Sequence, residues 1–192
     1  KRMNRQYTRE QYLDKVIKLR DTCPQIAVTS DIIVGFPGES QDDFEQTLQL
    51  IKTVEFDGLF AFQYSDRPQA PSVKLPDKLS EPIIRKRLQI VLELQEKFTK
   101  LKNKALVGST PLVLTDGLSK KQVSDQPVEN GPDLQWTGRT STNKIVNFYV
   151  DNPAIDCENL TGKMVGVRID KGFSHSLLGR VVNVESSTGG LK

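Results

Sequence analysis

The segment Thr29–Ser40, with the sequence TSDIIVGFPGES, decides how the first half of the chain folds. Its β-branched run Ile32–Val34 is typical of a buried strand of a parallel sheet that is covered on both faces. Glycine and proline end this run, and Ser40 then begins a helix, with Asp43 in the capping-box position three residues later. The pattern predicts a βα unit with a ligand at the end of its strand; an ordinary βα loop is the alternative interpretation.

Outward from this segment, hydrophobic periodicity predicts helices and strands in the order α-β-α-β-α. We expect a helix at 8–22, a strand at 26–34, a helix at 40–54, a strand at 59–64 and a helix at 81–105. The basic residues of the last helix, Arg87 among them, are interpreted as a solvated face. The side chains predicted to face the core are Tyr12, Val16, Ile17, Leu19, Phe44, Leu48, Ile51, Ile84, Leu88, Val91, Leu92 and Phe98.

The pattern changes near Gly108, where short β-rich runs begin to alternate with turns. Such spacing predicts a small OB-like antiparallel β-barrel after the α/β part. The fold class expected is therefore α/β plus all-β, with domains at 1–107 and 108–186 and a frayed tail at 187–192. His175 lies in a predicted hairpin loop without a partner for acid–base chemistry. The predicted strands are 111–115, 134–140, 145–150, 164–170 and 178–184.

Composition limits the class of protein. Of the 192 residues, 36% are hydrophobic and 27% are charged, which is typical of a folded soluble protein. No run approaches the roughly 18 apolar residues of a membrane-spanning helix, so we expect a cytoplasmic protein. The two cysteines, Cys23 and Cys157, are too few and too far apart for a disulfide framework or a cysteine metal site. A net charge of +3 means that any affinity for nucleic acid must come from local clusters.

The predicted sheet of the first half is incomplete. Two strands cannot close a sheet, and an apolar run such as Ile32–Val34 would leave unpaired backbone at an open edge. We therefore expect the chain to be the C-terminal portion of a longer protein. The open edge could also pair with a second copy and form a homodimer induced by truncation.

Three segments of the first half carry a family resemblance: Met3–Thr8 (MNRQYT), Thr29–Glu39 (TSDIIVGFPGE) and Phe62–Arg67 (FQYSDR). In order and spacing they resemble the late barrel of the radical S-adenosylmethionine methylthiotransferases. The first half is thus expected to be the C-terminal part of a partial (β/α) radical SAM barrel. The chain departs from the family pattern at Arg67–Pro71, where a Gly-Thr pair more often follows the arginine.

The second half resembles the RNA-binding TRAM domain of the tRNA-modifying branch of this family. The segments that carry this resemblance are Gly117–Lys121 (GLSKK), Thr137–Thr140 (TGRT) and Asn143–Phe148 (NKIVNF). Together the two resemblances cover nearly the whole chain.

The resemblance implies a full-length enzyme that adds a methylthio group to C2 of an N6-prenylated adenosine beside the tRNA anticodon. Such enzymes use S-adenosylmethionine and two [4Fe-4S] clusters, one of which is held by a CxxxCxxC triad early in the barrel. Cys23 and Cys157 cannot supply these ligands. We therefore expect no catalytic residue, no metal site and no activity in this chain alone.

The resemblance also implies site residues. Ser30, Asp31, Gly35 and Phe36 match the strand that lines the adenosyl pocket; a loop or helix-cap carboxylate is the alternative interpretation of Asp31. Trp136 and Phe148 could stack on bases, although a single tryptophan is more often a core residue. The residues expected to contact RNA are Arg5, Arg67, Lys120, Lys121, Arg139 and Lys144.

Two alternative functions remain open from the sequence. The paralogous branch of the family modifies an aspartate of a ribosomal protein with a similar barrel and TRAM domain. A stand-alone RNA-binding adaptor is the second alternative, and the unclosed α/β half argues against it because an adaptor has no use for a partial barrel.

Overall fold

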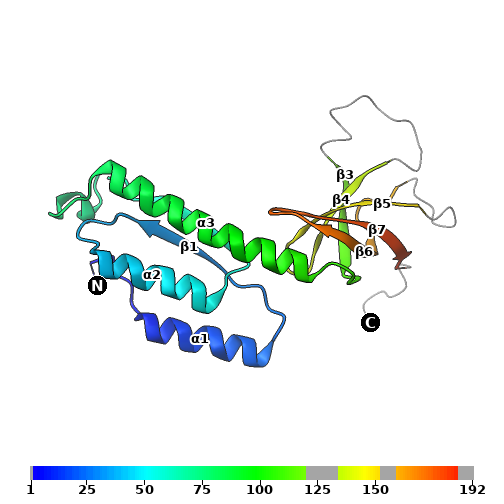
Figure 1. Cartoon of the computed structure of the whole chain (residues 1–192), viewed down its shortest axis with the longest axis horizontal. Coiled ribbons are helices and arrows are strands. Elements are labelled where there is room, and N and C mark those ends of the chain that lie inside the picture. Colours follow the sequence, from blue (N-terminus) through cyan, green and yellow to red (C-terminus); the bar gives the residue numbers. More distant parts are fainter. Residues whose placement is uncertain (1, 120–133, 152–158, 186–192) are drawn as a thin grey trace. The chain divides into compact units, whose positions relative to one another are not determined.

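The computed structural model describes residues 2–119, 134–151 and 159–185, in two compact units, Lys1–Thr99 and Lys100–Lys192. The division falls within the last helix, eight residues before the predicted domain boundary at 107. The elements of the first unit follow the predicted order (Figure 1). They are α1 (Arg9–Thr22), β1 (Thr29–Val34), α2 (Gln41–Val54), β2 (Gly58–Gln63), the 3₁₀ turn η1 (Pro71–Lys74) and α3 (Glu81–Ala105), whose last residues belong to the second unit.

The predicted capping box at Ser40 is present, and a second one lies at the start of α1. At α1, Thr8 Oγ1 accepts a hydrogen bond from the Gln11 N–H at 3.3 Å, and the Thr8 N–H donates back to the Gln11 side chain at 3.0 Å. At α2, Ser40 and Asp43 make the same reciprocal pair at 3.1 and 2.9 Å. The Ser40 hydroxyl and its backbone N–H donate to the Asp43 carboxylate and hold the pKa of that group below its usual range. These caps explain why both helices begin where the sequence predicts.

Strands β1 and β2 are parallel neighbours, with Ile32 opposite Ala61 and Ile33 opposite Phe62. Ile32, Val34 and Ala61 face the core that α1, α2 and α3 cover. The other face is bare: Ile33 is 37% exposed and Phe62 is 53% exposed. The expectation that β1 is covered on both faces is therefore wrong, because the described part of this unit places helices over one side only.

The strand predicted at 59–64 is confirmed as β2, and its aromatic side chains Phe60 and Phe62 point away from the helices. Three further core predictions are wrong: Ile17, Leu19 and Leu92 are about half exposed, at 57%, 47% and 47%. A two-stranded sheet covers only a narrow stripe of each helix, and residues such as Val16 and Val91 already fill it. Ile17 and Leu92 each lie one residue further along, are rotated by about 100° and so leave the stripe.

The second unit is a closed barrel with strand order β3-β4-β5-β7-β6. All neighbours are antiparallel except β5 and β7, which run parallel. This strand order is that of an OB-fold, so the predicted barrel is confirmed, and the parallel pair is the one departure from a purely antiparallel sheet. The strands are β3 (Leu112–Leu118), β4 (Trp136–Thr140), β5 (Ile145–Tyr149), β6 (Met164–Gly172) and β7 (Leu177–Val184).

Trp136 and Phe148 lie inside this barrel, with 4% and 0% of their surface exposed. They pack against inward-facing valines, leucines and isoleucines of β3, β5, β6 and β7 and of the segments between strands. The alternative in which these two rings stack on RNA bases is therefore wrong, and the core interpretation of Trp136 is confirmed. Period-two alternation places both residues on the inner face of their strands.

The end of α3 is bound to the barrel through Asn103, which is 3% exposed. Its amide nitrogen donates to the Phe173 carbonyl at 2.7 Å, in the hairpin between β6 and β7. Its amide oxygen accepts from the Lys144 ammonium at 3.1 Å. A Cβ on Gly172 would lie 2.6 Å from the Asn103 carbonyl oxygen, so only glycine allows this close approach.

Candidate functional site

A hollow of about 570 Å³ lies where β1 and β2 end. Its apolar walls come from the last residues of the strands and from the segments that follow them. Two arginines add positive charge, one from the segment before α1 and one from the loop after β2. The residues that form these walls and carry the charge are Ile33, Phe36, Phe62, Tyr64, Arg5 and Arg67.

The Phe36 ring is fixed by a chain of contacts. Tyr64 meets it edge to face, with the ring centroids 5.2 Å apart. The Tyr64 hydroxyl donates to Asp66 at 2.9 Å, and the Lys78 ammonium donates to the other oxygen of the same carboxylate. The Lys78 hydrogen bond, followed by that of Tyr64, holds the pKa of Asp66 below its usual range. One wall of the hollow is therefore held in place by a charged loop rather than by core packing.

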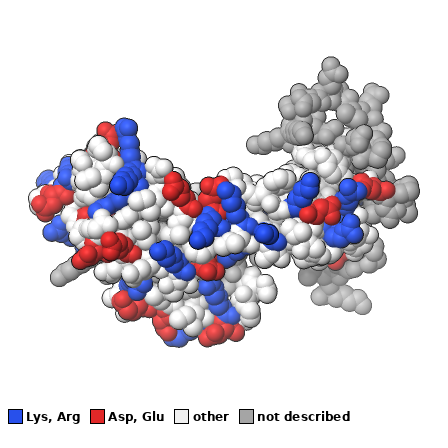
Figure 2. All heavy atoms as spheres, in the orientation of Figure 1, with Lys and Arg blue, Asp and Glu red and all other residues white. Residues whose placement is uncertain are grey.

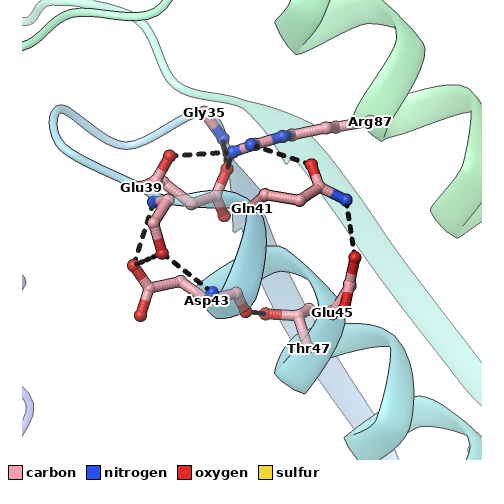
Figure 3. A network of polar contacts seen from close by, with 8 residues as sticks. Gly35, Glu39, Gln41, Asp43, Glu45, Thr47 and Arg87 are labelled. Carbon is pink, nitrogen blue, oxygen red and sulfur yellow. Dashed lines mark hydrogen bonds and ion pairs between the residues drawn. The ribbon is translucent and has the colours of Figure 1, made fainter.

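The turn between β1 and α2 is held by a buried ion pair (Figure 3). The Arg87 guanidinium donates to the Glu39 carboxylate at 2.6 Å and to the Glu39 carbonyl at 3.0 Å. The same carboxylate accepts the Gly35 N–H at 2.8 Å. Both charged side chains are about nine-tenths buried. The interpretation of Arg87 as part of a solvated face is thus wrong, because the Glu39 carboxylate in the turn requires a buried counter-charge.

Gly35 is explained by this turn. Its φ is +77°, and a Cβ there would lie 2.6 Å from Ile84. Its N–H is already bound to Glu39 and is not available to a ligand. Backbone geometry and packing therefore account for this glycine independently of its predicted contact with a cofactor.

The other predicted cofactor residues do not share one surface: Ser30 and Asp31 lie on opposite faces of β1, and Phe36 follows the strand. Phe36 lines the hollow. Ser30 is half-buried and shares the helix-covered face with Ile32, whereas Asp31 is exposed on the opposite face beside Phe60. Because successive side chains of a strand alternate, Ser30 and Asp31 cannot both direct their side chains to one ligand. Asp31 lies within β1, so its alternative interpretation as a loop or cap carboxylate is wrong.

Of the residues predicted to contact RNA, Arg5 and Arg67 line the hollow. Neither side chain has an ion pair or hydrogen bond within the ranges that the structure describes. The Lys144 ammonium is bound to Asn103 and has a structural role in the barrel. Lys120 and Lys121 lie outside the described residues.

Arg139 lies on β4 with its side chain 47% exposed. Its Nη1 donates to Asn143 Oδ1 at 2.9 Å, and its Nε lies 3.7 Å from Asp116 Oδ2. Basic and acidic side chains are interspersed over the face shown in Figure 2, as expected for a chain with a net charge of only +3. Asp116 and Asn143 were not identified from the sequence, because a single carboxylate within a strand such as β3 or a single amide in a turn carries no distinguishing pattern.

An iron–sulfur cluster does not fit this chain. Among the described residues there is no group of three histidine, cysteine or acidic side chains that could hold a metal ion. Cys23 is exposed and free, and the whole sequence contains only one other cysteine.

No helix in the described ranges is long and apolar enough to cross a membrane.

Comparison with known proteins defines the class: the chain belongs to the methylthiotransferase family. Three of its relatives carry the name tRNA-2-methylthio-N(6)-dimethylallyladenosine synthase. No protein-family model matches.

The relative from Syntrophus aciditrophicus is 46% identical over 180 residues, which is 94% of this chain and 36% of the relative. The one from Desulfosudis oleivorans is 45% identical over 191 residues, which is 99% of this chain and 41% of the relative. The one from Acetivibrio thermocellus is 40% identical over 95% of this chain and 35% of the relative. The chain therefore spans between a third and a little over two-fifths of the length of these relatives.

Proposed function

We propose that this chain is the C-terminal portion of a tRNA methylthiotransferase that adds a methylthio group to C2 of an N6-prenylated adenosine beside the anticodon. The name shared by its relatives supports the substrate. The observation in the structure that carries the proposal is the hollow, which brings Phe36 together with Arg5 and Arg67. These residues come from the three segments of the first half that resemble the family.

The hollow fits part of a nucleoside site. Its volume lies in the range of small-molecule pockets, roughly 300–1,000 Å³. Phe36 and Tyr64 offer apolar ring surfaces to a flat base, and Arg5 and Arg67 offer charge to a carboxylate or phosphate. When bound, S-adenosylmethionine would supply the radical chemistry of the family. The role of these residues is to bind and orient the ligands and to exclude water from the apolar wall.

The side chains of β1 and its neighbour β2 have one of two proposed roles, according to the face of the sheet on which they lie. Asp31, Ile33 and Phe62 share the bare face, which in a complete barrel would face the interior. Ser30 faces the helices and would support the strand instead. We therefore retain Asp31 and Phe36 as side-chain contacts and assign Ser30 and Gly35 to the shape of the strand and turn.

The chain alone is proposed to be inactive, since both [4Fe-4S] clusters of the family need thiolate ligands that two cysteines cannot provide. We assign residues 1–107 to the radical SAM barrel and 108–186 to a TRAM domain that binds the anticodon stem-loop. We also place the protein in the cytoplasm, where its tRNA substrate would be met. Its other partner is the remaining N-terminal portion of the same protein.

The barrel supplies the proposed RNA surface. In OB-folds, nucleic acid lies over the second and third strands and the adjoining loops, which here are β4, β5 and the segments that contain Lys120, Lys121 and Phe173. Arg139 is the exposed arginine of this surface. Cations in such positions make binding dependent on salt.

The test is binding of a prenylated anticodon stem-loop to this chain across a salt series, with Arg139→Ala and Lys120→Ala beside the wild type. We expect salt-sensitive binding that weakens in both variants, whereas the control Lys18→Ala on α1 binds as the wild type does. A purified ribosomal protein is the competing ligand. Binding of that protein without binding of the RNA at low salt would contradict the tRNA proposal and favour the ribosomal branch of the family.

A further inference from the structure

On its described strands β4 and β5, the proposed RNA surface has no exposed aromatic ring of the kind that OB-folds commonly use for unpaired bases; the 51% exposed ring of Phe173 lies in the hairpin between β6 and β7 instead. On the described strands β4 and β5, the rings of Trp136 and Phe148 lie in the core. Tyr149 is half-buried, and its hydroxyl accepts a hydrogen bond from Gln135 at 2.7 Å. A base that binds over these strands must therefore find another flat surface.

Arg139 has the surroundings of such a surface. Its neighbours across the sheet are Leu114 on β3 and Ile145 on β5. These apolar side chains are 46% and 37% exposed, on the same outer face as the arginine. A guanidinium between two exposed aliphatic side chains forms a row that is more suited to the face of a base than to a phosphate.

Two nitrogens of the same guanidinium already have polar partners within the protein. Asn143 accepts from Nη1 at 2.9 Å, and the Asp116 carboxylate lies 3.7 Å from Nε. Asn143 is fixed in turn by a left-handed backbone, with a φ of 61°, and its N–H donates to the Thr140 carbonyl. A carboxylate at this distance offsets the positive charge and repels a phosphate, but it leaves the planar face of the guanidinium open.

We propose that Arg139 stacks on an unpaired base of the RNA, and that Asp116 and Asn143 are positioning residues that hold its guanidinium flat against the sheet. The inference rests on the proposed function, because it requires that RNA lies on this barrel. It differs from that proposal in the chemistry of the contact: the RNA meets a planar surface at residue 139, not a phosphate-binding charge.

Arginine and lysine variants separate the two chemistries. Arg139→Lys keeps the charge and loses the plane, so we expect it to weaken binding of a prenylated anticodon stem-loop roughly ten-fold, as much as Arg139→Ala does. The dependence of affinity on salt should stay that of the wild type in both variants, since no phosphate contact is lost. Arg180→Lys on β7 is the matched control and should bind as the wild type does.

A second pair of measurements tests the base and the positioning residue. A series of stem-loops is prepared, each of which lacks the base at one loop position. We expect one member of the series to bind the wild type and Arg139→Lys with equal affinity, because it lacks the base that stacks on Arg139. Asn143→Gly, which tolerates the left-handed backbone, should weaken binding when residue 139 is arginine and have no further effect when it is lysine.

Wild-type affinity in Arg139→Lys, or a salt dependence in Arg139→Ala that is reduced by about one phosphate, would overturn the stacking proposal and leave RNA binding by the barrel intact. Lack of binding by the wild-type chain at low salt would overturn both proposals.

Discussion

The two sheets of this chain pair their backbone groups and bury their apolar faces in different ways. The barrel closes on itself, so each of its strands has two neighbours and the inner face is buried on all sides. The β1–β2 pair has helices on one face, while Phe60 and Phe62 stand exposed on the other at 64% and 53%. The barrel therefore buries a core of its own, whereas the described βα half leaves one face of its sheet exposed.

The largest expected difference comes from one substitution made in each sheet. Phe148→Ala removes a fully buried ring from the barrel core and should destabilise the barrel by about 3–5 kcal/mol. Phe62→Ala removes a ring from the bare face and should leave the free energy of unfolding nearly unchanged. Denaturant unfolding of both variants measures this.

If Phe62→Ala proved as destabilising as Phe148→Ala, the bare face would be covered in the isolated chain. The apparent stability would then depend on protein concentration, as expected for the homodimer that an open sheet can form.

The second prediction concerns how the βα half is held together. Arg87→Met would leave the Glu39 carboxylate buried without its partner and should cost about 3–5 kcal/mol. Adding Glu39→Gln to the same variant removes the buried charge and should recover a large part of this loss. Thermal unfolding of the single and double variants measures the difference.

The matched control lies on the barrel. Arg168→Met removes an exposed pairing with Asp170, and we expect little change in stability. Equal effects of the two arginine substitutions would contradict the view that the turn after β1 depends on a buried ion pair.

The third prediction compares one glycine from each half. Gly35 and Gly108 both have a positive φ, of 77° and 86°, but only Gly35 has a neighbour where a Cβ would lie. Gly108→Ala should cost about 1 kcal/mol for the left-handed backbone alone. Gly35→Ala adds a contact of 2.6 Å with Ile84 and should cost clearly more. Similar unfolding free energies for the two variants would show that Ile84 can move aside.

These comparisons also show what the sequence could and could not predict. Capping residues and periodicity placed the helices and strands, because the signals lie within each segment, as at Ser40 and Asp43. Which faces are covered could not be read in the same way: Ile33 and Phe62 look like core residues, and their exposure depends on what stands beside the sheet.

The residues of the site show the same difference: some could be predicted from a single segment, and others only from the fold. The family segments identified Phe36, Arg5 and Arg67, which the hollow brings together. The residues that hold the site, Glu39 with Arg87 and Asp66 with Lys78, belong to pairs that only the fold brings into contact. A charge 48 positions away carries no signal in a linear pattern, so Arg87 resembled a solvated residue.

The smallest expected effect concerns pH and the wall of the hollow. The pKa of Asp66 is depressed by hydrogen bonds from Lys78 and Tyr64. The stabilisation of the folded state by the Asp66 carboxylate is therefore complete above the ordinary aspartate pKa of about 3.9. That contribution is lost as the pH falls through the lower pKa of the folded state. Carboxyl NMR titration should show this depression, and Lys78→Ala should reduce it. An ordinary pKa for Asp66 would contradict the role of this carboxylate in fixing Tyr64.

The most direct test of the central claim is an NMR titration of this chain with a prenylated anticodon stem-loop, followed through the backbone amide signals. We expect shifts on the outer face of β4 and β5 around Arg139, and around Phe36 and Arg67 at the hollow. Shifts confined to the helices, or no shifts at low salt, would contradict the claim that this portion of the protein recognises the tRNA.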